Sequence, residues 1–296
     1  MCMWQSQALA GALSFGGSVP EEFDTARAGP GRMLEVVASA ASDAPLMNVR
    51  RAIMRASVSD ENRPAIAPYA REELLTCVIA RLIAQLGNEA RHVAVGAASP
   101  IPAAGALLLK QKRPELRLSF LHKRRGNPFT EGSRELFDLA GQGRIDVFFL
   151  GGAQIDGEAN LNLVRAEGRR FPGSFGSAFM YSVVKNVILF REEHSKRVLV
   201  PKVEFISAAG NPAALLTGKA LFSWQKEKRR FRLESVHAPG DIRAETGFSY
   251  DSPATVPLTA EPSKEDLALL RGAVAAEMAP NYPDFAKRVW GSAAGL

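Results

Sequence analysis

Apolar residues fall into helical and strand spacings that alternate along the chain from Tyr69 onward. Residues 72–86 carry Leu, Val and Ile three and four positions apart, which predicts an amphipathic helix that ends at Gly87. Short apolar runs predict three buried strands: 92–95, 116–121 and 146–150. Helical spacing between these runs predicts two helices: 103–111 and 132–139. This alternation is typical of a largely parallel α/β sheet with right-handed crossovers.

The second half of the chain carries weaker signals. A helix is predicted at 175–184 and a terminal helix at 267–277, with Ser263 as its N-cap and Asp266 in its acidic first turn. Apolar and β-branched runs predict further strands: 187–190, 198–206, 230–235 and 246–250. The charged segment between the first two of these is expected to be a hairpin turn or a short excursion.

Residues 1–64 differ from the rest of the chain. They are rich in Ala, Gly, Ser and Arg and show only short helical patterns, which predicts a poorly ordered or loosely attached extension. Met54 is followed by a polar run that resembles a start of translation. The upstream part is therefore either an unusual extension or a consequence of start-codon choice. Residues 65–296 are expected to form one domain.

One stretch of the chain, residues 145–164, combines a buried strand with a polar segment. The apolar run ends abruptly at Gly151 and Gly152, where the backbone can approach a ligand closely. Polar side chains then follow at nearly alternate positions: Gln154, Asp156, Glu158, Asn160 and Asn162. In open α/β sheets, ligands bind outside the carboxyl ends of the strands. We therefore expect a binding site where this strand ends.

Composition and charge exclude several classes of protein. With 46% hydrophobic and 23% charged residues, the chain has the composition of a soluble globular protein. The net charge of +6 indicates a mildly basic surface, either simply solvated or bearing a patch for an anionic cofactor. The sequence contains no nucleic-acid-binding motif, no apolar run long enough for a membrane span and no signal-peptide pattern. We expect a cytoplasmic protein that binds neither nucleic acid nor membrane.

Common catalytic motifs are missing. The two cysteines cannot form a disulfide framework, and Cys77 lies in a helical pattern as a core residue. The four histidines lack metal-ligand spacing, so no metal site is expected. The glycine turns match neither a dinucleotide fingerprint, nor a phosphate-binding loop, nor a nucleophile elbow. Spacing alone therefore predicts an α/β enzyme-like domain with three backbone-rich turns: 96–102, 151–160 and 173–178.

Motifs within these turns resemble those of the family I CoA-transferases. Residues 151–156, Gly-Gly-Ala-Gln-Ile-Asp, and residues 159–162, Ala-Asn-Leu-Asn, are similar to the family signature after its central strand. Residues 95–100 resemble its first glycine turn, residues 171–176 its Leu-Pro-Gly-Ser-Gly-Gly loop, and residues 239–243 part of its carboxyl-terminal region. The resemblance covers roughly residues 69–275. It is greatest to the beta subunits of two-subunit enzymes, of the glutaconate CoA-transferase and steroid-ring-opening hydrolase kind.

The resemblance implies a fold, a substrate class and a partner. The fold would be a mostly parallel Rossmann-like sheet of the CoA-transferase (NagB/RpiA-like) type, flanked by helices. The enzyme would act on acyl-CoA with an alpha-like subunit, with coenzyme A as a substrate and no tightly bound cofactor. The residues that match the motifs would bind substrate or CoA: Gly96, Ser99, Pro100, Gly151, Gly152, Gln154, Asp156, Asn160, Gly173, Ser174 and Gly176. From the residues alone, these glycines could equally be ordinary turn glycines and the polar residues loop caps.

The resemblance does not identify a nucleophile. In the family's transferases, a beta-subunit glutamate after the second strand attacks the acyl-CoA, and the matching position lies near residues 119–125. No acidic residue occurs between Glu115 and Glu131, so the catalytic residue is unknown. His122 and the basic residues after it form either a solvated turn or a contact to CoA phosphates. Three alternatives remain: an acyl-CoA hydrolase or ring-cleaving subunit, a non-catalytic partner subunit, and an unrelated sugar-phosphate-binding protein.

Overall fold

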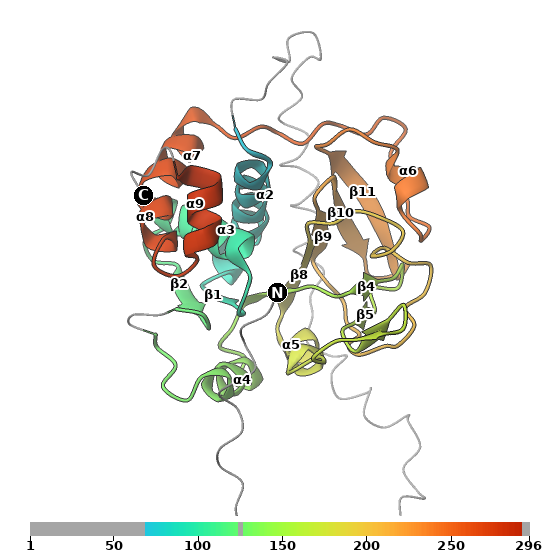
Figure 1. Cartoon of the computed structure of the whole chain (residues 1–296), viewed down its shortest axis with the longest axis horizontal. Coiled ribbons are helices and arrows are strands. Elements are labelled where there is room, and N and C mark those ends of the chain that lie inside the picture. Colours follow the sequence, from blue (N-terminus) through green and yellow to red (C-terminus); the bar gives the residue numbers. More distant parts are fainter. Residues whose placement is uncertain (1–68, 124–126, 292–296) are drawn as a thin grey trace, which may run out of the picture. The chain divides into compact units, whose positions relative to one another are not determined.

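The computed structural model describes residues 69–123 and 127–291, which all belong to one structural unit. The extension predicted at residues 1–64 lies outside the described residues. Within them, the predicted alternation of helices and strands is confirmed (Figure 1). No helix in the described ranges has the length and apolar character needed to cross a membrane.

A seven-stranded sheet occupies the centre of the described part of the chain, in the order β11-β10-β9-β8-β3-β1-β2. Its strands are β1 (His92–Val95), β2 (Arg117–Phe120), β3 (Val147–Leu150), β8 (Asn186–Arg191), β9 (Ala214–Thr217), β10 (Ala220–Gln225) and β11 (Arg230–Val236). The five strands from β2 to β9 pair in parallel, and β10 and β11 add antiparallel neighbours. The largely parallel sheet predicted from the sequence is therefore correct.

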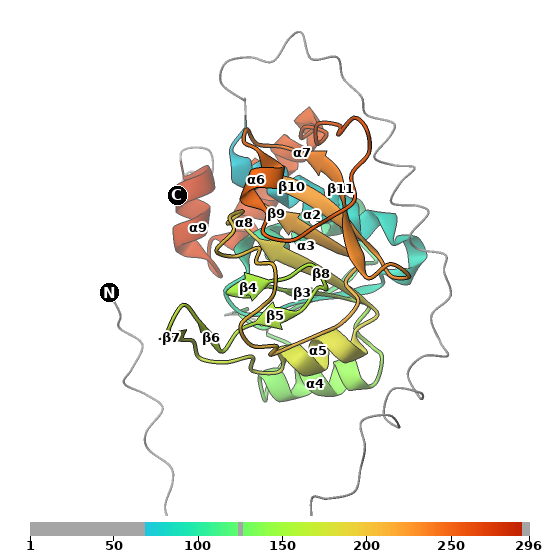
Figure 2. The same cartoon turned by 90° about the vertical axis from the view of Figure 1, so that its right-hand side faces the viewer.

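Helices cover both faces of this sheet. They are α2 (Arg71–Gln85), α3 (Pro100–Lys112), α4 (Ser133–Gly141), α5 (Ser177–Val183), α6 (Ile242–Glu245), α7 (Lys264–Leu269), α8 (Ala275–Met278) and α9 (Pro283–Trp290), with the short 3₁₀ helix η2 (Gly87–Glu89) and the π-helix η3 (Leu270–Val274). In Figure 1, α2, α3 and the terminal helices gather on one side, and Figure 2 shows α4 and α5 side by side on the other.

Two hydrophobic clusters result, one on each face of the sheet. Along β3, Val147 and Phe149 join the cluster beneath α2 and α3, and Phe148 and Leu150 join the cluster beneath α4 and α5. All four side chains are buried, because successive residues of a strand point to opposite faces and both faces are covered. A central parallel strand is therefore a continuous apolar run, because both of its faces are buried.

The helix pair α2 and α3 packs very closely on its face. A Cβ atom at Gly105 would collide with the side chain of Ile79, so only glycine allows this approach of the two helices. The amino end of α2 is anchored from the other end of the chain, because the guanidinium of Arg271 donates two hydrogen bonds to buried Glu73 at 2.8 and 2.9 Å. These contacts hold α3, and with it the turn after β1, in a defined position.

The predicted strand at 198–206 is wrong. This segment is irregular, and its backbone pairs with a small hairpin, β4 (Gln154–Ile155) and β5 (Leu161–Asn162), instead of joining the main sheet. Ile155 N–H donates to Val198 O at 2.7 Å and Val200 N–H donates to Ile155 O at 2.9 Å. Pro201 then interrupts any ladder, because proline has no N–H.

The predicted strand at 246–250 is also wrong, and two strands of the main sheet are absent from the sequence-based prediction. Residues 246–250 are irregular, and Gly247 packs so tightly that an added Cβ would collide with the carbonyl oxygen of Leu199. Strands β9 and β10 lie in a nearly continuous apolar run in which only Gly218 and Lys219 mark the turn. Two further small strands, β6 (Arg165–Ala166) and β7 (Arg169–Arg170), form a separate hairpin.

The carboxyl-terminal helix is longer than predicted. It begins at Lys264 and continues through η3 to Met278, and the expected cap is confirmed, since Asp266 N–H donates to Ser263 Oγ at 3.0 Å. Helix α9 follows it and has no counterpart in the sequence-based prediction. Helix α3 also begins earlier than expected, at Pro100, which shortens the turn after β1.

Candidate active site

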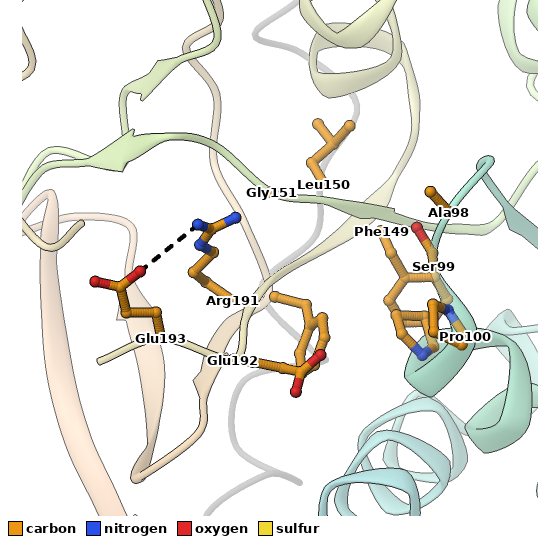
Figure 3. Close-up of a pocket in the computed structure, with 11 residues that line it drawn as sticks. Ala98, Ser99, Pro100, Phe149, Leu150, Gly151, Arg191, Glu192 and Glu193 are labelled. Atoms are coloured by element: carbon orange, nitrogen blue, oxygen red, sulfur yellow. Dashed lines mark ion pairs between the residues drawn. The ribbon is translucent and has the colours of Figure 1, made fainter. Parts of the chain in front are cut away.

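A cavity of about 420 Å³ opens where strands β1, β3 and β8 end. After β1 the chain crosses through α3 to β2 on one side, and after β3 it continues to β8 on the other, so the cavity lies at the topological switch point. Its lining is formed by Ala98, Ser99, Pro100, Pro102, Phe149, Leu150, Gly151, Phe190, Arg191, Glu192 and Glu193. Figure 3 shows the labelled residues of the turn after β1 facing those that follow β8 across this space.

The turn after β1 forms one wall of the cavity. Ser99 is the N-cap of α3, and Pro100 and Pro102 occupy its first turn. Prolines have no N–H, so two of the first three residues of this helix offer no backbone donor. The wall is therefore more apolar than an ordinary helix start, and it suits an uncharged acyl group better than a phosphate.

The two glycines after β3 are required by the chain's own backbone. A Cβ atom at Gly151 would lie 2.9 Å from Phe190 O, and one at Gly152 would lie 2.8 Å from Gln154 O. Gly151 lines the cavity, whereas Gly152 is buried behind it. The pair thus lets β3 turn into the β4–β5 hairpin while remaining close to the end of β8.

The predicted polar site residues Gln154, Asp156 and Asn160 are buried in the β4–β5 hairpin. The carboxylate of Asp156 accepts hydrogen bonds from the backbone N–H of Glu158 and Asn160, both at 3.0 Å, from Asn160 Nδ2 at 3.1 Å and from Val203 N–H at 3.3 Å. These bonds use the acceptor capacity of the carboxylate inside the chain. Asp156 and Asn160 hold the hairpin against residues 198–206 and are not among the residues that line the cavity.

Gln154 is satisfied within the chain in the same way. Its Oε1 accepts from Asn162 Nδ2 at 2.8 Å and from Glu204 N–H at 3.2 Å, and its Nε2 donates to Glu204 Oε1 at 2.9 Å. The amide of Gln154 therefore connects the hairpin to the segment that carries Glu204. The polar residues of this stretch therefore stabilise the hairpin behind the cavity and do not line it.

The other predicted site residues lie apart from the cavity lining. Gly96 is in the turn after β1, where an added Cβ would lie 3.6 Å from the Phe148 ring. Gly173 adopts a φ of +108°, and the carbonyl oxygen of Ser174 accepts a hydrogen bond from Ser177 N–H at 2.8 Å at the start of α5. Gly176 is the N-cap of α5, and a Cβ there would collide with the ring of Phe137.

Charged residues at the end of β8 and directly after it are predicted from the sequence only as a turn, yet Arg191, Glu192 and Glu193 line the cavity. The Glu193 carboxylate lies 2.5 Å from Arg197 and 3.8 Å from Arg191, and it accepts a hydrogen bond from Ser195 Oγ at 2.7 Å. Partial burial by itself would raise the pKa of Glu193, but the bonds from Ser195 and Arg197 hold that pKa below its ordinary value. Glu193 is therefore a charged carboxylate with its own partners.

The buried histidines and Cys77 belong to the interior. His194 hydrogen-bonds Thr217 Oγ1 at 2.8 Å and Thr246 Oγ1 at 3.0 Å, and burial lowers its pKa to about 4. Burial likewise lowers the pKa of His237 to about 4 and raises the pKa of the Cys77 thiol to about 12. A thiol with such a pKa is a poor nucleophile, which agrees with a core role. In the described residues, no group of His, Cys, Asp and Glu is arranged to hold a metal ion.

The end of β2 carries no carboxylate. His122 stacks on Tyr282 with ring centroids 5.1 Å apart, and Lys123 lies 3.8 Å from Glu277. The described part of the basic turn is therefore held against the carboxyl-terminal helices. Ser119, within β2 itself, is buried and hydrogen-bonded to His92 Nε2 at 2.9 Å.

Comparisons with known proteins agree on one family. The family model described as coenzyme A transferase matches residues 75–236, which is more than half of the chain and includes every residue that lines the cavity. The chain is 29% identical to the B subunit of 3-oxoadipate CoA-transferase from Pseudomonas knackmussii, over 44% of this chain and 58% of that protein. It is 25% identical to the B subunit of glutaconate CoA-transferase from Acidaminococcus fermentans, over 42% of this chain and 55% of that protein. The matches thus span little more than half the length of these relatives.

Solved structures share the fold. The decarboxylase AibA/AibB matches with a TM-score of 0.61 and 22% identity, over 75% of this chain and 99% of that chain. IpdAB of Rhodococcus jostii RHA1 matches with a TM-score of 0.59 and 21% identity, over 69% of this chain and 94% of that chain. At this identity the structural likeness shows the fold alone. Together with the family match over residues 75–236, it establishes that the chain belongs to the coenzyme A transferase family.

Proposed function

We propose that this chain is the beta-like subunit of a heteromeric enzyme that acts on acyl-CoA thioesters and moves coenzyme A between carboxylic acids. The observation that carries the proposal is the cavity at the ends of β1, β3 and β8, within the region that matches the family. The two sequence relatives, both named as B subunits of CoA-transferases, support it. Coenzyme A is then a substrate, and the reaction needs no tightly bound cofactor.

The volume of the cavity indicates which part of an acyl-CoA it can hold. A volume of about 420 Å³ is at the lower end of the range for ligand pockets, so it holds an acyl group and the reacting thioester. The nucleotide part of CoA then lies outside this space, on a surface completed by the alpha-like partner. Ser99, Pro100 and Gly151 contact the acyl group, while Gln154, Asp156 and Asn160 support the wall.

The source of the nucleophile favours a second candidate function. A carboxylate that attacks a thioester needs an unengaged lone pair, and Glu193 and Glu192 are each paired with arginines. Residues 116–130, where the resemblance places the nucleophile, contain no acidic residue. The alternative is that the partner subunit supplies the nucleophile, and that the assembly hydrolyses or cleaves an acyl-CoA while this chain completes the pocket.

One experiment separates these functions. The chain is co-purified with its alpha-like subunit, incubated with an acyl-CoA and a labelled carboxylic acid, and treated with hydroxylamine. Transfer of CoA to the labelled acid supports the transferase, and a hydroxamate found on this chain or on its partner identifies the nucleophile. Release of CoA without an acceptor acid indicates hydrolysis. If the complex neither binds nor consumes any CoA thioester, the proposed function is wrong.

The low cysteine content indicates in which cellular compartment the chain is found. The chain has only two cysteines and therefore no disulfide framework, which is typical of proteins in a reducing compartment. We therefore propose a cytoplasmic location, which fractionation of cells that produce the tagged chain would test.

A further inference from the structure

Arg191 is the only cationic side chain among the described residues that line the cavity. It occupies the last position of β8, and its Nε is buried without a hydrogen-bond partner in the described ranges. Its contact with Glu193 spans 3.8 Å, which is too long for a hydrogen bond. A guanidinium has five N–H donors, and those of Arg191 make no hydrogen bond within the described residues. Since Nε itself is buried, the terminal NH₂ groups are the donors that a ligand can use.

The two acids beside Arg191 are already paired with other cations. Glu192 lies 3.4 Å from Arg71, and Glu193 lies 2.5 Å from Arg197, with a second contact to that side chain at 3.2 Å. In this group of described ion pairs, three arginines face two carboxylates. One positive charge is therefore left over, and the long distance to Glu193 identifies it as the charge of Arg191. Figure 3 shows Arg191 and Glu193 facing each other at one side of the cavity.

The other walls of the cavity strengthen an interaction with an anion. Phe149, Leu150, Phe190 and the two prolines of α3 supply apolar surface, which lowers the local dielectric constant and makes a charged hydrogen bond stronger than in water. The planar fork of an arginine matches a carboxylate, because two parallel N–H groups meet its two oxygens. A carboxylate is thus the anion that fits both the size of the cavity and its charge.

We propose that Arg191 binds a carboxylate of the substrate in this cavity and thereby selects acids as ligands. This inference rests on the proposed function, in which a carboxylic acid accepts CoA. The carboxylate comes from one of two sources: the reacting end of the acceptor acid, or the far end of an acyl group derived from a dicarboxylic acid. Glu193, held by Arg197 and Ser195, acts as a positioning residue beside Arg191.

Ligand-observed NMR with the full chain, in complex with its partner subunit, tests the inference. The probes are acetate, glutarate and coenzyme A, and the variants are R191Q, R191K and R197Q. Loss of a charged hydrogen bond predicts that R191Q weakens carboxylate binding by about tenfold or more. R191K should retain part of the affinity, because it keeps the charge but loses the fork. Arg197 lies outside the cavity lining, but R197Q releases Glu193 to pair with Arg191, so it should also weaken carboxylate binding, by less than R191Q.

The outcomes separate the inference from the proposed function. Coenzyme A binding that is equal in wild type and R191Q shows that the fold and the CoA site are intact. Equal affinity for acetate and glutarate supports the acceptor end as the source, and a preference for glutarate supports the far end of a dicarboxylic acyl group. If CoA binds but carboxylates bind equally well to wild type and R191Q, or not at all, the inference is overturned while the proposed function stands. If CoA also fails to bind, both are overturned.

Discussion

Two polar clusters lie near the carboxyl ends of the central strands, and they differ in what they leave unsatisfied. In the β4–β5 hairpin, the Asp156 carboxylate accepts four hydrogen bonds from its own chain. At the end of β8, Arg191 lines a cavity, and its guanidinium makes no hydrogen bond within the described part of the chain. The first cluster is therefore part of the protein interior, and the second has the properties of a binding site. A polar residue is available for a ligand only when its own chain has not already used its donors and acceptors.

The largest effect expected from a single substitution is the loss of the Asp156 cluster. The substitution Asp156→Ala leaves four donors without their acceptor and should lower the free energy of unfolding by roughly 3–5 kcal/mol. Urea denaturation would measure it. The matched control is Glu158→Ala two residues away, an exposed site where the change should stay within about 0.5 kcal/mol. Similar unfolding midpoints for the two variants would contradict the structural role of Asp156.

A second interior cluster should make stability depend on pH. Burial lowers the pKa of His194 and His237 from 6.5 to about 4, so the unfolded chain binds more protons than the folded chain between these values. Stability is therefore fully present above pH 6.5 and falls as the pH drops towards 4, by roughly 3 kcal/mol for each histidine. The ion pair between Lys219 and Glu245 lies beside His194.

Urea denaturation at several values between pH 7 and pH 4 would measure this dependence. The variant His237→Gln should have a shallower slope, because one of the two titrating groups is removed. A slope that is the same in wild type and variant would show that carboxylates, rather than these histidines, control the acid sensitivity.

The smallest expected effect on stability is at the cavity. Arg191 and Arg271 have side chains that are both 39% exposed, but Arg271 pairs with a carboxylate that is 2% exposed, and the partner of Arg191 is 34% exposed and 3.8 Å away. Arg191→Gln should therefore change the free energy of unfolding by less than about 0.5 kcal/mol. Arg271→Gln should lower it by roughly 3 kcal/mol, because it leaves a buried charge unpaired. Thermal or urea denaturation of the two variants would measure the difference. Equal losses of unfolding free energy would contradict the view that Arg191 is less engaged by its own chain than Arg271.

Most of the parallel half of the fold can be predicted from the sequence because its signals are local. Strands β1 and β3 are short apolar runs that end at glycine, and α2 shows a clear helical period. The second half is predicted less well. Strand β11 agrees with the strand predicted at 230–235, but residues 198–206 have the composition of a strand and find their hydrogen-bond partners in the β4–β5 hairpin. Nothing local in the sequence indicates which partner a β-like segment will choose.

The candidate site is predictable only in part, for a similar reason. Ser99, Pro100 and Gly151 line the cavity as expected, since glycine and proline turns after strands mark the ligand edge of such a sheet. Gln154, Asp156 and Asn160 have polar side chains that could bind a ligand. In the structure, however, they make their hydrogen bonds within the hairpin and to the neighbouring segment. In the sequence, Arg191 is one residue of a charged turn, and only the arrangement of the surrounding ion pairs distinguishes it from other surface arginines.

The cavity at the ends of β1, β3 and β8 is proposed to receive the acyl part of a CoA thioester, and the function depends on this claim. A crystal structure of the chain with the proposed alpha-like subunit and a non-hydrolysable acyl-CoA thioether tests it most directly. We predict ordered density for the acyl group between Ser99, Gly151 and Arg191. An acyl group bound elsewhere, with this cavity filled by water, would contradict the claim.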